Sequence, residues 1–167
     1  MKRKMSSAKA MRRRNNFLLW GLSSGVILLD QVSKCFAEVY LKHRNFLLNS
    51  WLSFTLSHNT GCAWSLFQGR TMALGLLGMV VLFFTYYLRN IFGIYERPIT
   101  FGLLFGGILG NVIDRLCRGF VVDFIDVNLQ IYRWPTFNVA DAALCVSVFI
   151  FFCFKSPARG FAAGGAT

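Results

Sequence analysis

Four apolar blocks, each close to the length that crosses a lipid bilayer, constrain the fold of this chain more than any other feature. They cover residues 17–41, 71–92, 98–117 and 137–154. A helix needs about 20 apolar residues to cross the hydrocarbon core, and inside lipid only helices and closed barrels satisfy the backbone. Because the blocks lack the period-2 alternation of barrel strands, they predict four transmembrane helices.

The composition agrees with this pattern. Hydrophobic residues make up 55% of the 167 residues, and charged residues make up 15%, against about 25% charged residues in a typical soluble domain. We therefore expect a mainly α, integral membrane protein with three parts. These are a basic tail over 1–16, a four-helix membrane domain over 17–154 and a C-terminal tail over 155–167.

Basic residues predict the orientation of the helices. The first 16 residues carry lysines and arginines and no acid, and the basic residues of the other flanks are Arg89, Arg97, Lys155 and Arg159. If four helices alternate, all of these fall on one side, which the positive-inside rule assigns to the cytoplasm. Both termini are then cytoplasmic, and connections 42–70 and 118–136 face outward.

The basic tail has a second interpretation as a nucleic-acid-binding arm. The net charge of +11 suits that idea, but nothing downstream offers a module that reads a groove. A basic segment directly before an apolar block is better explained by attraction to anionic lipid. We expect membrane lipid, and no nucleic acid, as a partner.

The first block also resembles a secretory signal peptide. A lipoprotein-type cleavage site requires small residues before a cysteine, whereas Lys34 directly precedes Cys35. Asp30 also lies inside the block. We therefore expect a retained helix.

The first outer connection predicts strands. Residues 51–59, WLSFTLSHN, alternate apolar and polar positions, and Asn59-Thr60-Gly61 is typical of a turn. We expect a small extracytoplasmic β-sheet between helices one and two. Trp51, Trp64 and Trp134 are of the type that prefers the membrane interface.

Aspartates in and beside the apolar blocks are the candidate functional residues: Asp30, Asp114, Asp123, Asp126 and Asp141. An ionised group at the centre of a membrane helix costs roughly 2.5–3.5 kcal/mol on insertion scales, so such a group points to function. In the predicted orientation, Asp114, Asp123 and Asp141 all lie near the outer face and can meet there.

Asp123 and Asp141 together suit metal-free peptide hydrolysis. Two carboxylates held close cannot both ionise easily, so they share a proton. The ionised one can take a proton from water, while the protonated one polarises a peptide carbonyl. Polar support is available from Asn59, Asn111, Arg115 and Asn138.

Structural roles compete with this hypothesis. Asp114 can pair with Arg115, Asp123 and Asp126 can be solvated loop charges, and Asp141 can cap the fourth helix. For Asp126 we prefer the solvated role. Asn138 is the better cap, which leaves the Asp141 carboxylate free. Asp30, with Lys34 four residues later, suits a structural ion pair that steadies the site.

Other catalytic or metal-binding sets are poorly supported. Ser33 and Lys34 are adjacent, so their side chains diverge on a helix. His43 and His58 have no zinc-protease spacing, and the five cysteines form no C-x-x-C pair. GGILGN lacks the lysine of a phosphate-binding loop. We expect neither a metal nor a cofactor.

Five motifs taken together resemble the lipoprotein signal peptidases, also called signal peptidase II. They are DQVSK at 30–34, NTGCAW at 59–64, GGILGNVIDR at 106–115, VVDFID at 121–126 and FNVAD at 137–141. Each motif alone is weak, but their order within a four-block chain is highly specific. One departure is Cys62, where the family more often has a small or aliphatic residue.

The resemblance implies a four-helix aspartic endopeptidase of the bacterial inner membrane, active at the outer face. Its substrate is a diacylglyceryl-modified prolipoprotein, cut just before the lipidated cysteine, and its inhibitors include globomycin. By motif match Asp123 and Asp141 are the catalytic pair. The matched supporting or substrate-binding positions are Asp30, Asn59, Gly61, Asn111, Asp114, Arg115 and Asn138. We expect a monomer.

A small transporter or channel is the alternative function, because intramembrane carboxylates can also form a permeation or proton path. That function predicts acids distributed through the depth of the membrane. Here they cluster near one face.

Overall fold

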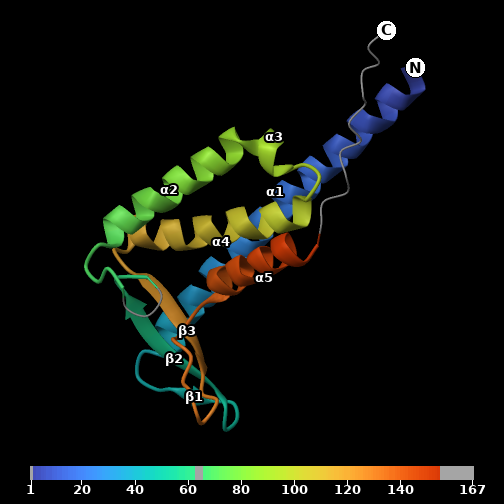
Figure 1. Ribbon diagram of the computed structural model, residues 1–167. Coiled ribbons are helices and arrows are strands. Elements are labelled where there is room, and N and C mark those ends of the chain that lie inside the picture. Colours follow the sequence, from blue (N-terminus) through green and yellow to red (C-terminus); the bar gives the residue numbers. More distant parts are fainter. Residues whose placement is uncertain (1, 63–65, 155–167) are drawn as a thin grey trace.

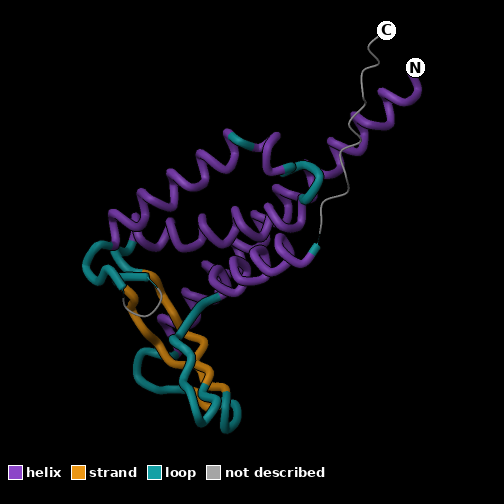
Figure 2. Tube along the Cα trace, viewed as in Figure 1, coloured by secondary structure: helices purple, strands orange, loops and turns teal. Residues whose placement is uncertain are grey.

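Five helices and three strands make up the computed structural model, which describes residues 2–62 and 66–154 (Figure 1). Their order is α1 (Lys2–Tyr40), β1 (Phe46–Leu47), β2 (Leu52–Asn59), α2 (Thr71–Tyr87), α3 (Arg89–Phe92), α4 (Pro98–Cys117), β3 (Val121–Val127) and α5 (Val139–Cys153). The helices gather in one body, and the strands extend from one end of it (Figure 2). Trp64 and the tail over 155–167, with Lys155 and Arg159, lie outside the described residues.

Helix α4 is the centre of the helical body and packs against α1, α2 and α5. Glycines make this close approach possible. A Cβ added at Gly106 would lie 2.7 Å from the Val26 Cβ, and one at Gly107 would lie 2.6 Å from the Ala140 carbonyl oxygen. Small residues at such positions let helix backbones approach closely, as is common between membrane helices.

Within the described residues, α4 alone is long and apolar enough to cross a membrane by itself, with 20 residues and a mean hydropathy of 1.4. Helices α2 and α5 are apolar but shorter, at 17 and 15 residues. Large apolar side chains on them nevertheless stay exposed, among them Phe83 at 64%, Phe149 at 63% and Phe152 at 80%.

Helix α1 starts far earlier than the apolar block that predicted it, at Lys2 rather than at residue 17. The basic segment contains no glycine or proline before Gly21 and is rich in good helix formers. Contacts with the link before α4 hold it. The Arg12 guanidinium lies 4.7 Å from the centre of the Tyr95 ring, and Asn15 donates a 2.8 Å hydrogen bond to the Tyr95 carbonyl.

The predicted second helix, 71–92, is divided into α2 and α3. Gly93, at φ 64°, ends α3 in the left-handed region that glycine tolerates. The third and fourth predicted helices, 98–117 and 137–154, correspond to α4 and α5 within two residues.

The sheet is antiparallel, with strand order β1-β2-β3. The alternating segment 51–59 forms β2, as expected, but β3 comes from the connection after α4. The expected location of the sheet, between helices one and two only, was therefore incomplete. Strand β3 is nearly all buried, so its run VVDFIDV lacks the alternation that identified β2. The register places Ser57 opposite Asp123, after an irregularity between Phe54 and Ser57.

Candidate active site

Asp123 and Asp141 reach the same region from different elements. Asp123 lies on β3 and is 2% exposed. Asp141 is the third residue of α5, whose N-cap is Asn138. The site lies where the sheet meets the helical body (Figure 1). The sequence therefore identified two carboxylates, 18 residues apart in the chain, that the fold brings near each other.

Asn138 links the two carboxylates. Its Nδ2 donates a 2.7 Å hydrogen bond to Asp123 Oδ1, and its Oδ1 accepts a 2.9 Å bond from the Asp141 backbone N–H. Asp141 in turn accepts from the Asn138 backbone N–H at 3.3 Å, which completes a capping box. The expectation that Asn138 caps α5 is confirmed. The expectation that this leaves the Asp141 carboxylate free was wrong, because one of its oxygens also caps the helix.

Asn111 of α4 joins the same set. Its Nδ2 donates a 2.7 Å hydrogen bond to Asp141 Oδ1, and its Oδ1 accepts from Asn138 Nδ2 at 3.2 Å. Both amides therefore have defined orientations, since each must donate to a carboxylate. Two asparagines thus fix the positions of both aspartates.

Asn59, at the end of β2, holds Asp123 from the other side. Its Nδ2 donates to Asp123 Oδ2 at 3.0 Å, and its Oδ1 accepts from the Gly61 N–H at 2.9 Å. The second bond forms the turn that Asn59-Thr60-Gly61 predicted. Both oxygens of Asp123 are therefore hydrogen-bonded.

Arg115 of α4 supplies positive charge beside the pair. Its guanidinium donates to the Gly61 carbonyl at 3.1 Å and interacts electrostatically with both Asp141 and Asp123. Its Nε is buried without a hydrogen-bond partner among the described residues. A polar atom in that state is one that a bound substrate can satisfy.

A buried ionic cluster lies behind the site. Lys34 is fully buried and pairs with Asp30 at 2.7 Å and Asp114 at 2.8 Å. Its ammonium also donates to Asn111 Oδ1 at 3.1 Å. The i,i+4 pairing of Asp30 with Lys34 is as expected.

The two acids of this cluster tie four elements together. Asp30 Oδ1 accepts from the Ala140 N–H of α5 at 2.9 Å, and Asp114 Oδ2 accepts from the Val122 N–H of β3 at 3.1 Å. The cluster therefore sets the positions of α5 and β3, the two elements that carry Asp141 and Asp123.

Several side chains in this cluster take partners that differ from the expected ones. Asp114 pairs with Lys34 and Arg118 rather than with adjacent Arg115. Residues four apart share a helix face, whereas neighbours diverge. The sequence predicted only Asp30 as an ion-pair partner of Lys34. Its reach to Asp114 and Asn111 depends on how α1 packs on α4, which no local pattern encodes.

Asp126 is not a solvated loop charge. It lies on β3, is 3% exposed, and accepts hydrogen bonds from Arg133 at 2.9 Å and from Ser53 at 3.0 Å. The bonds from Arg133 lower the pKa of the Asp126 carboxyl, because they favour its charged form. Asp126 is thus part of the sheet and not of the candidate site.

The pKa of the Asp123 carboxyl is raised to about 7, chiefly by burial and next by the negative charge of Asp141, while the hydrogen bonds from Asn59 and Asn138 oppose the rise. A carboxyl with this pKa holds a proton at neutral pH far more often than an ordinary aspartate. In the described part of the chain, no three histidine, cysteine, aspartate or glutamate side chains gather closely enough to bind a metal ion.

Residues 22–155 match the model of a protein family described as signal peptidase (SPase) II. The chain belongs to the signal peptidase II family. A lipoprotein signal peptidase of Teredinibacter turnerae is 37% identical over 134 residues, which cover 76% of this chain and 80% of the relative. A lipoprotein signal peptidase of Coxiella burnetii is 41% identical over 141 residues, 79% of this chain and 85% of the relative.

The fold of this signal peptidase II family member also resembles solved structures. One, a bacterial membrane enzyme determined in meso at 2.3 Å resolution, has a TM-score of 0.69 and 32% identity over 78% of this chain and 82% of its own. Family membership makes the protein a peptidase of the signal peptidase II type, and the fold neighbours indicate a bacterial membrane protein. The matched range contains both aspartates and every supporting residue described above.

Proposed function

We propose that this member of the signal peptidase II family removes signal peptides from diacylglyceryl-modified prolipoproteins by cutting just before the lipidated cysteine. The relatives named lipoprotein signal peptidase support this choice of substrate. The observation that carries the mechanism is the Asn138 side chain, which hydrogen-bonds to Asp123 and to the Asp141 backbone at once. It supports a catalytic aspartate pair that shares one proton.

In this mechanism Asp123 holds the proton and Asp141 is the base. The raised pKa of Asp123 supports its role as the acid. Asp141 removes a proton from water, the resulting hydroxide oxygen bonds to the scissile carbonyl carbon, and Asp123 gives its proton to the carbonyl oxygen. When the diol intermediate collapses, it returns a proton to Asp123. The leaving amine takes the proton held by Asp141, so the pair regains its starting state.

Arg115 is suited to bind the substrate, and Asn59, Asn111 and Asn138 hold the two aspartates by hydrogen bonds. The unpartnered Nε of Arg115 is suited to a carbonyl of the bound peptide. Asp30, Asp114 and Lys34 are positioning residues, since they bind α5, β3 and Asn111 rather than the reacting atoms. Asp30, Asp114, Asp123 and Asp141 are joined in one network of hydrogen bonds and ion pairs through Lys34, Asn111 and Asn138. Acids gathered at one place favour a peptidase over a permeation path through the bilayer.

We further propose that four helical segments span the bacterial inner membrane, with both termini in the cytoplasm. The start of α1 lies at the opposite end of the molecule from the sheet and the candidate site (Figure 1). Its basic residues suit the cytoplasmic face. The sheet end is then outside, where a lipidated precursor arrives laterally within the bilayer. The partners are membrane lipid, prolipoproteins and globomycin-type inhibitors, and the chain acts as a monomer.

The test uses the full-length protein purified in detergent. A diacylglyceryl-modified precursor and its unmodified form are each incubated with it, with and without chelator, and the products are separated by gel and mass spectrometry. We expect cleavage of the lipidated form only, just before the cysteine, with no effect of the chelator.

Two variants make the assignment of residues testable. Asp123→Asn and Asp141→Asn each abolish cleavage, while Asp126→Asn, a buried aspartate outside the site, retains it. Full processing by Asp123→Asn or by Asp141→Asn would contradict the proposed catalytic pair. Equal cleavage of the unmodified and the lipidated precursor would contradict the proposed specificity for a lipidated substrate.

A further inference from the structure

We propose that this protein binds a membrane phospholipid in an apolar cavity on the face of the sheet that points away from Asp123. One acyl chain lies among aromatic rings, and the lipid phosphate lies on Arg44. The cavity has a volume of about 460 Å³, within the range of small-ligand sites. Its lining includes Phe36, Tyr40, Phe46, Phe54, Phe124 and Arg44.

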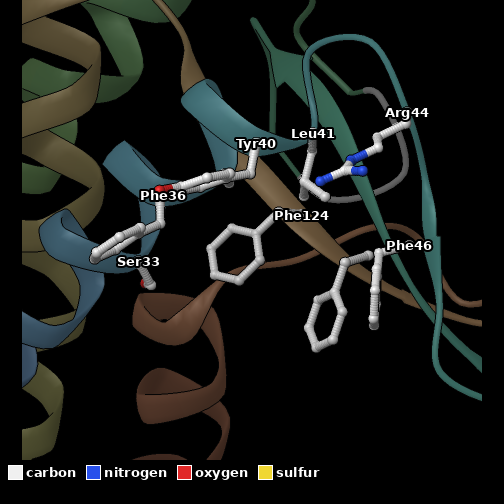
Figure 3. Close-up of a pocket in the computed structure, with 9 residues that line it drawn as sticks. Ser33, Phe36, Tyr40, Leu41, Arg44, Phe46 and Phe124 are labelled. Atoms are coloured by element: carbon white, nitrogen blue, oxygen red, sulfur yellow. The ribbon is translucent and has the colours of Figure 1, made fainter.

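This cavity is separate from the candidate active site. Successive side chains of a strand point to opposite faces of the sheet, so Phe124 points away from the face that Asp123 serves. Phe124 is 7% exposed and packs with Val122 and Ala37 beneath the cavity. Figure 3 shows its ring between Phe36 and Tyr40 of α1 on one side and Phe46 of β1 on the other.

An apolar track on α1 leads into the cavity. Leu29, Val32 and Phe36 recur at spacings of three and four, which places them on one face of the helix. They are 60%, 43% and 58% exposed. The Phe36 ring stacks on the Tyr40 ring, with ring centres 5.9 Å apart. An acyl chain that follows this face therefore stays in apolar contact up to the last turn of the helix.

Arg44 gives the site its preference for a phosphate. Its guanidinium is directed back across the cavity toward Leu41 (Figure 3). No carboxylate in the described part of the chain pairs with it, and Glu38, the acid nearest in sequence, is paired with His58 at 2.8 Å. Guanidinium groups match phosphate oxygens with two parallel hydrogen bonds. A diacylglycerol moiety carries no phosphate, so a phospholipid fits this site better than the lipid of a prolipoprotein substrate.

The test is photo-crosslinking in nanodiscs that contain the full-length protein. One sample holds phosphatidylglycerol with a diazirine in its acyl chain, and the other holds the matched diazirine diacylglycerol. Labelled peptides are mapped by mass spectrometry. We expect the phosphatidylglycerol probe to label the segment 33–46 or Phe124 in preference to other lipid-facing segments, and an excess of unlabelled phosphatidylglycerol to compete.

Two matched charge changes decide the role of Arg44. Arg44→Gln lowers labelling at the cavity by about tenfold, the usual value of a charge-assisted hydrogen bond. Lys42→Gln removes the same charge two residues away, outside the cavity, and changes labelling less than about twofold. Phe46→Ser, at an exposed edge, also lowers labelling without removing charge.

Three results would overturn the proposal. They are equal labelling by the diacylglycerol probe, labelling unaffected by Arg44→Gln, and labelling spread evenly over the exposed helices. None of these depends on cleavage of a precursor, so the proposal stands or falls independently of the proposed peptidase mechanism.

Discussion

Asn138 donates a 2.7 Å hydrogen bond to the carboxylate of Asp123 while its own side-chain oxygen caps the helix that carries Asp141. One side chain therefore has two separable tasks. It stabilises the first turn of α5, and it sets the distance and orientation between the two aspartates.

Substitution of Asn138 separates the two tasks. Asn138→Ala removes both, and we expect a loss of about 1 kcal/mol of stability from the missing cap, together with a large loss of cleavage. Asn138→Ser keeps an oxygen that can cap, but its shorter side chain lacks the amide NH2 group that donates to both Asp123 and Asn111. Thermal unfolding in detergent should show near-normal stability for the serine variant, while its kcat falls at least tenfold. Equal activity of Asn138→Ser and wild type would contradict the role in orienting Asp123.

The pH dependence of cleavage follows from Asp123. Its carboxyl has a pKa raised from 3.8 to about 7, chiefly by burial. The protonated form that donates to the carbonyl oxygen is present below this pH and is lost as the pH rises through it. We expect kcat to fall about tenfold per pH unit well above 7, with the apparent pKa belonging to the coupled pair. Initial rates from pH 5 to 9 on the lipidated precursor test this, and a rate that rises steadily to pH 9 would contradict it.

The buried ion cluster predicts a large effect of Lys34. Lys34→Met leaves the buried Asp30 carboxylate without its cation, so we expect a loss of about 3–5 kcal/mol in stability. Glu38→Gln is the matched control, because it breaks the partly exposed pair with His58 and should cost less than about 1 kcal/mol. Denaturant unfolding of both variants in the same detergent provides the comparison. Similar losses for the two would show that burial does not determine the strength of these pairs.

Two glycines on the long helices, Gly110 on α4 and Gly21 on α1, should respond in opposite ways to alanine. A Cβ at Gly110 would lie 2.7 Å from Asp30 Oδ2 and 3.1 Å from the Ala140 Cβ, so Gly110→Ala forces α1 and α5 away from α4. We expect a loss of about 1–3 kcal/mol from this overpacking. Gly21 has nothing within 4 Å, and Gly21→Ala should gain up to about 1 kcal/mol from helix propensity. Melting temperatures of the two variants check both signs.

The sequence predicted the parts of the fold that depend on local patterns. Apolar blocks located α4 and α5 closely, and the alternation of WLSFTLSHN located β2. It could not locate β3, because this strand is buried along nearly its whole length and its run VVDFIDV does not alternate between apolar and polar positions. It also missed the start of α1. The helix begins in a polar segment of good helix formers, and a search for apolar blocks does not detect such a segment.

The sequence predicted which residues form the candidate site better than it predicted their hydrogen-bond and ion-pair partners. Asp123, Asp141, Asn59, Asn111 and Asn138 do meet, and the motifs spaced along the chain were enough to select them. The ion pair of Asp114 with Lys34 and the hydrogen bond of Asp126 with Ser53 were not predictable. They depend on how α1 packs on α4 and on the pairing of β2 with β3, which are properties of the packed molecule.

The capping box at the start of α5 has a consequence for how the protein is made. Asn138 and Asp141 lie at the start of α5, which is synthesised after the strands that carry Asn59 and Asp123. On the proposed mechanism, a nascent or truncated chain that lacks α5 has only half of its proton-sharing pair. On that mechanism, hydrolytic competence arises only when α5 has docked against α4 and β3, so a partly assembled chain has no complete catalytic pair.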